Sequence, residues 1–262
     1  MTHKTAAILA IGDELLSGRT RDANIHYLAG WLTERGVLLQ EARIVGDDQA
    51  MIVRSLNALR PFYDYVFTSG GIGPTHDDIT ADAVSAAFGV PCVAHPGAVA
   101  MIKDWYRTHE MEATPARLRM ARMPEGAELI QNPVSGAPGI RMENVFVMAG
   151  VPKIFQGMLH AIESAIERGA LVHARAVTAM GLPESALADK LRELQSSLEG
   201  VAIGSYPIGG DLKGLTVVAR SESAEKAEAA IDAISGAMRA LGADPQMGDH
   251  RPSGEEVTAE KT

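Results

Sequence analysis

Short apolar runs alternate with segments of helical periodicity along the first part of the chain. Each run ends at glycine or at polar residues, which is typical of strands that are buried on both faces of a sheet. The runs occupy residues 6–11, 65–68 and 145–149, and residues 37–45 are predicted as a further strand. Because strands and helices alternate strictly, the pattern predicts a mostly parallel sheet with helices on both faces, which is a three-layer α/β/α domain of the α/β class.

The helices between these strands are predicted from apolar residues at a spacing of three and four. The first is expected to begin near Asp22 and to end at Gly36, where glycine favours termination. The second should follow Asp48 and end before Pro61, and Thr80 is expected to cap the third. Further helical patterns cover residues 81–88, 96–123 and 153–168.

The pattern changes after Gly169, where the predicted order is strand, helix, strand, strand, helix. The two middle strands are expected to pair across the turn Gly209-Gly210-Asp211. This order is sufficient for a small two-layer α+β domain. The five elements are predicted at residues 172–180, 184–197, 201–206, 215–220 and 224–241.

Two domains and a tail are therefore predicted. The first domain covers residues 1–170, and a small α+β (βαββα) domain covers residues 171–246. The residues after Pro245 are polar and lack periodicity, so residues 247–262 are expected to form a disordered tail.

Composition narrows the classes of partner. The formal net charge of the 262 residues is −9, which argues against nucleic acid and against anionic membranes, since both need a basic face. A phosphate ligand is compatible with this charge, because backbone N–H groups or a bound cation can hold it. Cys92 is the single cysteine, so neither an intramolecular disulfide nor a zinc-binding cysteine cluster is expected. No apolar stretch is long enough to span a bilayer, and we expect a cytoplasmic protein.

A glycine-rich segment follows the predicted strand at residues 65–68. Gly70, Gly71 and Gly73 allow a tight turn and let backbone N–H groups approach a phosphate closely. The hydroxyl groups of neighbouring residues could add further donors. We predict contacts with phosphate from these three glycines and from Ser17, Thr68, Ser69, Thr75 and Asp77. A tight turn without a ligand is the alternative, and three glycines alone do not decide between the two.

Acidic residues extend this segment and recur at the ends of the other strands. Asp77 and Asp78 are adjacent carboxylates, which repel each other and a phosphate unless a cation shares the space. We expect one aspartate to cap the following helix and Asp78 to reach the ligand. Glu14 and Asp47 follow the first two strands, and the carboxyl ends of parallel strands lie at one edge of a sheet. Each of these acids alone could be a helix cap or a solvated loop residue.

These segments resemble a known family. Residues 68–80 are similar to the signature of the MoaB/Mog molybdopterin-binding fold. Residues 12–18, followed by Asp22 and Asn24, resemble the first loop of CinA proteins (competence/damage-inducible protein A) and of the molybdotransferase MoeA. The similarity extends over about residues 5–170.

Later segments resemble CinA proteins in particular. They are residues 132–134, 137–139 and 147–152, and the βαββα stretch that follows resembles the small middle domain of CinA. Ala149 departs from the family, which usually has proline before Gly150, so a looser loop is expected there. The carboxy-terminal amidase domain of many CinA proteins is not expected in this chain.

The resemblance implies a MogA-like domain that binds a pterin or dinucleotide phosphate. It implies Asp47 and Asp78 as the catalytic acids, and Glu14 with these two as ligands of a divalent metal, Mg²⁺ or Co²⁺. CinA-type domains are linked to metal-dependent hydrolysis of dinucleotide pyrophosphates of the ADP-ribose and FAD class, and the family forms homo-oligomers. A metal-dependent pyrophosphohydrolase is therefore the first hypothesis. Two alternatives remain: an enzyme of molybdenum cofactor biosynthesis, by adenylyl transfer or metal insertion, and a non-catalytic module that binds pterins or nucleotides.

Overall fold

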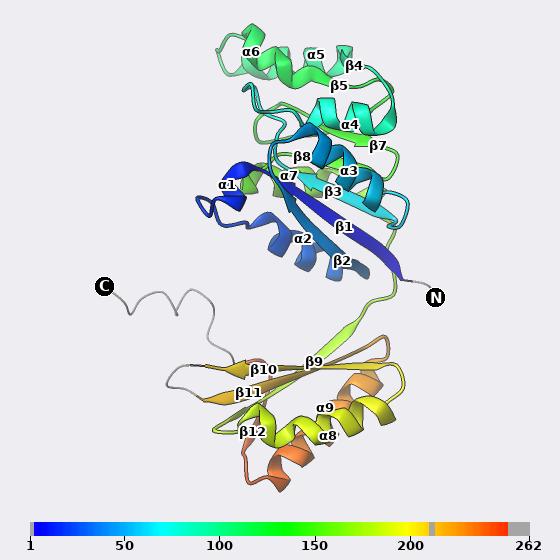
Figure 1. The fold of residues 1–262 in the computed structure, drawn as a ribbon, viewed down its shortest axis with the longest axis vertical. Helices are drawn as coiled ribbons and strands as arrows, with labels where there is room; N and C mark the ends of the chain where they lie inside the picture. Colours follow the sequence, from blue (N-terminus) through cyan, green and yellow to red (C-terminus); the bar gives the residue numbers. More distant parts are fainter. Residues whose placement is uncertain (1–2, 210–212, 251–262) are drawn as a thin grey trace, which may run out of the picture. The chain divides into compact units, whose positions relative to one another are not determined.

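The computed structural model describes residues 3–209 and 213–250. The chain divides into two compact units, the first ending at Ala170 and the second beginning at Leu171 (Figure 1). Each unit has its own sheet and its own hydrophobic core. The two units are therefore described separately.

A six-stranded sheet forms the centre of the first unit, in the order β2-β1-β3-β8-β7-β6. The pairs β1–β2, β1–β3 and β3–β8 are parallel, as the alternating pattern predicts, whereas β6, β7 and β8 pair in antiparallel fashion. The fold class is confirmed, with antiparallel pairing at one edge of the sheet. The strands are β1 (Lys4–Ile11), β2 (Val37–Val45), β3 (Tyr65–Ser69), β6 (Glu128–Ile130), β7 (Gly139–Met142) and β8 (Val145–Met148).

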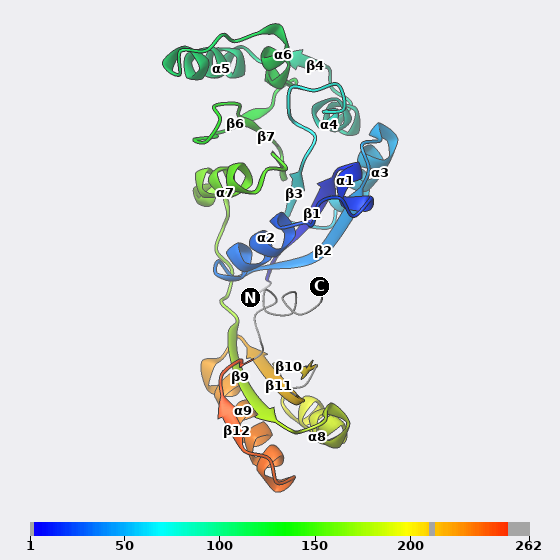
Figure 2. The same ribbon diagram turned by 90° about the vertical axis from the view of Figure 1, so that its left-hand side faces the viewer.

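Helices cover both faces of this sheet. One core cluster joins the sheet to α3 and α4 through residues such as Ile52, Leu56 and Val84, all fully buried. The other joins it to α2 and α7 through Leu28 and Phe155. The three-layer prediction is thereby confirmed (Figure 2). These helices are α2 (Asn24–Thr33), α3 (Gln49–Leu59), α4 (Thr80–Phe88) and α7 (Pro152–Ala161), and the short α1 (Asp13–Leu16) follows β1.

Two long predicted helices are shorter than expected. The helical pattern over residues 96–123 divides into two helices and a 3-10 turn, because Pro115 begins a new helix and Arg122 enters a strand. The helix predicted over residues 153–168 ends at Ala161, before the 3-10 turn η2 (Glu163–Ala165). The elements of this region are β4 (Cys92–Ala94), α5 (Pro96–Thr108), α6 (Pro115–Leu118), η1 (Arg119–Ala121) and β5 (Arg122–Pro124).

The second unit is an antiparallel sheet with two helices packed on one face. The strand order is β10-β11-β9-β12, and the core combines strand residues such as Val217 with helix residues such as Leu187 and Ile234. The elements are β9 (His173–Met180), α8 (Glu184–Ser197), β10 (Val201–Ile208), β11 (Gly214–Ser221), α9 (Ala224–Ala240) and β12 (Pro245–Met247). Of the predicted turn at residues 209–211, only Gly209 lies within the described residues.

The first residues of the predicted disordered tail, 247–250, are paired with β9. Met247 pairs with Val177 of β9, and the Gly248 amide donates to the Ala176 carbonyl at 2.8 Å. His250 N–H donates to the Thr178 hydroxyl at 3.2 Å. Polarity alone suggested a tail, but the free edge of β9 supplies hydrogen-bond partners to this short segment. Residues 251–262 lie outside the described residues.

The described helices include none that is long and apolar enough to cross a membrane.

Candidate functional site

A cleft of about 580 Å³ opens at the carboxyl ends of β1, β3 and β8. This is the edge at which ligands bind in parallel α/β sheets. The loop after β3 contributes Gly70 to Pro74, the loop after β8 contributes Ala149 to Pro152, and Glu14 comes from α1. Asp78 faces the same cleft. The structure therefore brings together two of the loops that the sequence places at one sheet edge, those after β1 and β3, and adds the loop after β8.

The glycine segment turns where three strand ends converge. Gly70 has φ 112°, and a Cβ there would lie 2.1 Å from the Ile11 carbonyl oxygen at the end of β1. Its amide donates to the Met148 carbonyl of β8 at 3.0 Å. Gly71 has φ 67°, and a Cβ there would lie 2.2 Å from the Thr80 hydroxyl. Glycine is required at both positions for two reasons. A side chain would collide with Ile11 or with Thr80, and both residues have a positive φ, which other residues rarely adopt.

Thr80 was predicted to cap α4, but it does not. It is the first residue of the helix, and its hydroxyl donates instead to the Gly70 carbonyl at 3.0 Å. No side chain caps this helix, whose N-cap residue is Ile79, so neither Asp77 nor Asp78 has the capping role that was expected for one of them. Thr80 is fully buried and fixes the glycine segment to the start of α4.

Asp78 is held by the loop that carries it. One of its carboxylate oxygens accepts hydrogen bonds from the Thr75 amide, at 2.7 Å, and from the Thr75 hydroxyl. A Cβ at Gly73 would lie only 2.6 Å from this oxygen. Thr75 is therefore a residue that positions Asp78, and it does not line the cleft itself. Asp77 points elsewhere, with an exposed side chain that lies 3.9 Å from the His76 imidazole.

Asp47 lies beside the cleft, in a group of carboxylates. The Asp13 amide donates to the Asp47 carboxylate at 3.0 Å, and the Asp47 amide donates back to Asp13 at 3.3 Å. Partial burial raises the pKa of Asp47 above its usual value, and the negative charges of Asp13, Glu14 and Asp77 raise it further. Asp48 caps α3 as predicted, accepting from the Met51 amide at 2.8 Å.

Three further residues for which phosphate contacts are predicted do not line the cleft. Thr68 is fully buried, and Ser69 is 3% exposed with its hydroxyl accepting from the Asn24 amide group at 2.7 Å. Both belong to the interior of the sheet and have no surface that a ligand could reach. Ser17 is exposed, but its hydroxyl donates to the Glu14 carbonyl at 3.3 Å and it does not line the cleft. Consecutive strand residues point to opposite faces of a sheet, and Thr68 and Ser69 are both buried because helices cover both faces.

The predicted metal ligands do not form an all-protein cage. Among residues 3–209 and 213–250, no three carboxylate, imidazole or thiol groups are arranged to hold a metal ion. Glu14 and Asp78 line the cleft together, whereas Asp47 lies beside it. Two carboxylates fit a Mg²⁺-type ion that takes its remaining ligands from water and from phosphate oxygens, which is how such ions are often bound.

The opposite wall of the cleft comes from residues to which the sequence gave no individual role. Tyr106 of α5 and Met120 of η1 contribute, with Asn132 and Ser135 from the loop before β7. The Asn132 amide group donates to the Ser135 hydroxyl and to the Ala137 carbonyl, each at 2.7 Å. Only the Asn-Pro-Val motif at residues 132–134 marks this wall in the sequence, and α5 and η1 carry no such signal.

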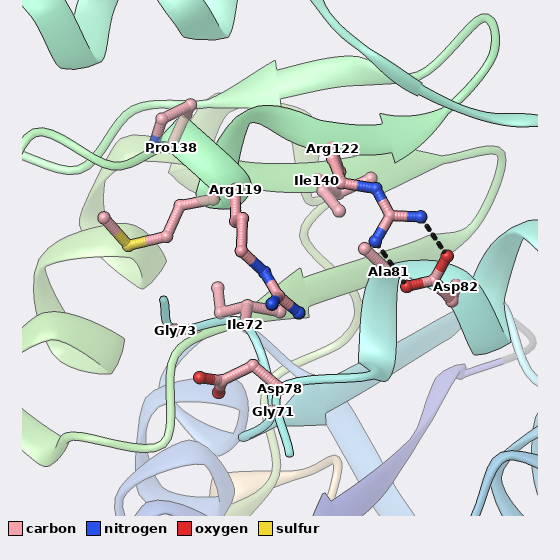
Figure 3. Close-up of a pocket in the computed structure, with 11 residues that line it drawn as sticks. Gly71, Ile72, Gly73, Asp78, Ala81, Asp82, Arg119, Arg122, Pro138 and Ile140 are labelled. Atoms are coloured by element: carbon pink, nitrogen blue, oxygen red, sulfur yellow. Dashed lines mark hydrogen bonds and ion pairs between the residues drawn. The ribbon is translucent and has the colours of Figure 1, made fainter. Parts of the chain in front are cut away.

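A small cavity of about 20 Å³ adjoins the cleft and shares with it the glycine segment, Asp78 and Met120. Arg122 and Arg119 line it (Figure 3). Arg122 is paired with Asp82 through two hydrogen bonds, at 2.6 and 3.1 Å. Arg119 extends from η1 toward Ile72 and the loop that carries Asp78 (Figure 3).

Comparison with known proteins agrees with this architecture. Residues 7–168, more than half of the chain, match the family model described as probable molybdopterin binding domain. Residues 172–245 match the model of the FAD synthase middle domain.

Relatives are similar over most of the chain. A protein of Aeropyrum pernix is 33% identical over 240 residues, which cover 87% of this chain and 89% of that protein. A CinA-like protein of Gloeobacter violaceus is 32% identical over 90% of this chain, and the chain spans 58% of that longer protein. The crystal structure of the protein CinA with unknown function from Thermoplasma acidophilum superposes with a TM-score of 0.58 at 33% identity, over 62% of this chain and 98% of that one.

These matches account for the converging strand ends, the glycine segment and the second unit, and the chain therefore belongs to the family described as probable molybdopterin binding domain, with CinA-like proteins among its relatives.

Proposed function

We propose that this protein is a metal-dependent pyrophosphohydrolase of dinucleotides of the ADP-ribose and FAD class. One observation carries the proposal: the carboxylates of Glu14 and Asp78 face the same cleft as the open glycine segment. In this proposal the N–H groups of Gly71 and Gly73 would bind phosphate and the two acids would bind a cation, whereas the Gly70 amide is already donated to the Met148 carbonyl. The match of residues 172–245 to the FAD synthase middle domain supports a dinucleotide ligand over a simpler phosphate.

The shape of the cleft suits a ligand with both an apolar part and a phosphate part. Apolar side chains line the wall away from the glycine segment, among them Tyr106, Met120 and Ile154. Flat ring systems such as flavin, adenine and pterin pack well against walls of this kind. The phosphates would then lie over Gly70 to Gly73. No arginine or lysine of the described residues lines the cleft itself, whereas the positive side chains of Arg119 and Arg122 line the adjoining small cavity.

Hydrolysis of a phosphoanhydride requires positioning and neutralisation of charge. A divalent cation between Glu14, Asp78 and the phosphate oxygens would supply that neutralisation and would activate water. The backbone N–H groups of the glycine segment would stabilise charge on the phosphate as it develops. Thr75 keeps the Asp78 carboxylate in place through two hydrogen bonds, so that little reorganisation is needed. The water oxygen forms the new bond to phosphorus, the bridging P–O bond breaks, and two monophosphates leave.

The test is turnover of ADP-ribose and FAD with Mg²⁺ or Co²⁺, with AMP measured by chromatography. We expect AMP release by the wild-type protein and a loss of about 100-fold or more in Asp78→Asn, which is the scale of removing a catalytic acid or metal ligand. Asp104→Asn is the matched control, because Asp104 is an exposed aspartate of α5 that pairs with Arg107. Absence of AMP release across both substrates and both metals would refute the proposal.

A second candidate is an enzyme of molybdenum cofactor biosynthesis. The family description, probable molybdopterin binding domain, favours a pterin in the same cleft. The expected observation would be loss of ATP that depends on molybdopterin and on Asp78. We rank this candidate second because of the FAD synthase middle domain match.

A non-catalytic pterin- or nucleotide-binding module is the third candidate. It would bind ligand in the same cleft without turnover. This candidate is preferred if Asp78→Asn leaves both ligand affinity and every measured turnover unchanged.

A further inference from the structure

Arg117, Arg119 and Arg122 lie close together in the sequence, and their surroundings differ. The Arg122 guanidinium is paired with Asp82. The Arg117 guanidinium lies over the Tyr106 ring, 4.3 Å from its centre, and donates to the Glu112 carbonyl at 2.5 Å. Within the described part of the chain, the Arg119 guanidinium has no hydrogen bond, ion pair or ring contact with another side chain or with the backbone, so no carboxylate of the protein neutralises it.

The position of Arg119 connects it to the proposed ligand site. It lines the small cavity together with Gly71, Gly73 and Asp78, and these three also line the large cleft. The cavity has room for about one water molecule, which is also the size of a single phosphate oxygen. A ligand that lies in the cleft over the glycine segment can therefore place one oxygen in the cavity between this segment and Arg119.

A phosphate in this cleft needs a positive group beside it. Two carboxylates, Glu14 and Asp78, line the cleft, and they repel a phosphate in the absence of a cation. Arg119 is the unpaired positive side chain of the adjoining cavity, since Arg122 is neutralised by Asp82. A guanidinium presents several N–H donors in a plane and matches phosphate geometry better than an ammonium group does.

We propose that Arg119 binds a phosphate oxygen of the ligand and so selects phosphate-bearing ligands. The proposal rests on the part of the proposed function that places a phosphate ligand in the cleft, and not on its hydrolysis. Arg119 is exposed in the free protein and reaches the cavity from η1, an element separate from the strand ends that carry the acids. In this arrangement two separate parts of the fold hold the phosphate: the glycine segment after β3 and the Arg119 guanidinium of η1.

The test uses α,β-methylene-ADP with Mg²⁺, a phosphate-bearing probe whose bridging bond cannot be hydrolysed. Isothermal titration calorimetry of the full chain measures its affinity. We expect Arg119→Gln to weaken binding at least about tenfold, or about 1.4 kcal/mol, and Arg119→Lys to weaken it less. The matched control is Arg107→Gln, because Arg107 is an exposed arginine of α5 that pairs with Asp104 away from both cavities. Its affinity should stay within about twofold of wild type, and both glutamine variants should keep the wild-type melting temperature.

Three results would overturn the proposal: affinity of Arg119→Gln within twofold of wild type, an equal loss in Arg107→Gln, or no binding of the probe to the wild-type protein. The outcomes separate this proposal from hydrolysis. If Arg119→Gln weakens binding and the wild-type protein never cleaves ADP-ribose, the phosphate contact stands and the proposed activity fails. If the wild-type protein cleaves ADP-ribose and Arg119→Gln has the same kcat/KM, the activity stands and the Arg119 contact is wrong.

Discussion

Single glycines make room for the acidic groups of the site. A Cβ at Gly73 would meet the Asp78 carboxylate at 2.6 Å, and a Cβ at Gly12 would meet the Glu14 carboxylate at 2.5 Å. The carboxylates therefore lie directly against the backbone at strand ends. Glycines of this kind serve the site, whereas Gly70 serves the fold, because its Cβ would meet the Ile11 backbone.

This distinction predicts different results for two alanine variants. Gly70→Ala should lower the free energy of unfolding by about 1–3 kcal/mol, because an alanine at φ 112° is strained and would meet a backbone oxygen. Gly73→Ala should change stability by less than about 1 kcal/mol while reducing turnover about tenfold or more, because only the end of the Asp78 side chain must move. Urea unfolding and ADP-ribose turnover measure the two effects. Full activity in Gly73→Ala would contradict the expectation.

The acidic group around Asp47 predicts a dependence on pH. Burial and the neighbouring carboxylates raise the pKa of Asp47 above 3.8, so the folded protein disfavours the charged form. The folded protein is more stable with Asp47 protonated than with Asp47 charged. This stability is complete below pH 3.8, and it is lost as the pH rises through the raised pKa of the folded state. Asp47→Asn should therefore be more stable than wild type at pH 7, by less than about 1 kcal/mol, and the difference should vanish toward pH 3.8.

Urea unfolding at several pH values between 4 and 7 checks this expectation. Asp48→Asn is a suitable control, since asparagine caps helices about as well as aspartate. A wild-type protein that is more stable than Asp47→Asn at every pH would show that the Asp13 hydrogen bonds outweigh the charge repulsion.

At this scale the sequence located the sheet edge at which acids and glycines gather, but not the direction of each side chain. Glu14, Asp78 and the three glycines line the cleft, and their binding roles stay predictions. Thr68 and Ser69 were assigned to the ligand although they face the interior. A motif records which residues are near a turn, whereas burial depends on the helices that pack on each face of the sheet.

Between elements, the cleft is held together by side chains that connect one strand end to another. Asn24, the first residue of α2, is 3% exposed, and its amide group donates to the Ser69 hydroxyl and to the Gly150 carbonyl, each at 2.7 Å. It thereby ties the end of β3 to the loop after β8. Both loops line the cleft, so Asn24 sets the distance between its walls.

Replacing this residue should affect both stability and ligand binding. Asn24→Ala should lower the free energy of unfolding by about 1–3 kcal/mol, because one buried and one partly buried acceptor lose their donor. It should also weaken binding of α,β-methylene-ADP. Asn57→Ala is the control: Asn57 is exposed on α3 and accepts only from Arg60 at 3.1 Å. Equal effects of the two substitutions on stability and on binding would exclude the bridging role.

Strands that carry a hydrophobic pattern of their own were predicted better than short strands without one. The strands β1, β2, β3 and β8 carry such a pattern, which located them although their partners are distant in sequence. The strand β5 has three residues and pairs with β4, about 30 positions earlier, so no local pattern marks it. The same reason explains why residues 96–123 were predicted as one helix and why β12 was assigned to a tail.

In the molecule as a whole, the two units have separate hydrophobic cores. The core of the second unit contains Val177, Leu215 and Ile234 and no residue of the first unit. The cleft, in turn, is lined entirely by residues of the first unit. Core substitutions in the second unit should therefore lower the stability of that unit without changing ligand binding in the first unit.

We expect Ile234→Ala to destabilise the second unit by about 2–5 kcal/mol, because a fully buried isoleucine leaves a cavity. Affinity for α,β-methylene-ADP should stay at the wild-type value at temperatures below the transition. Differential scanning calorimetry should show a shift of one unfolding transition only. Leu56→Ala, also fully buried, is the counterpart in the first unit and should shift the other transition. Equal shifts of both transitions in either variant would mean that the units unfold as one.

The sequence by itself determined the alternation of strands and helices, the change of pattern near residue 170, and the gathering of acids and glycines at one sheet edge. These features follow from local periodicity and from the rule that parallel strands end on the same side. The tertiary structure decided which side chains face the cleft, placed Asp47 beside it, and brought Arg119 to the glycine segment from about 46 residues away. The physical reason is that burial and charge pairing depend on contacts between distant segments, which no local pattern encodes.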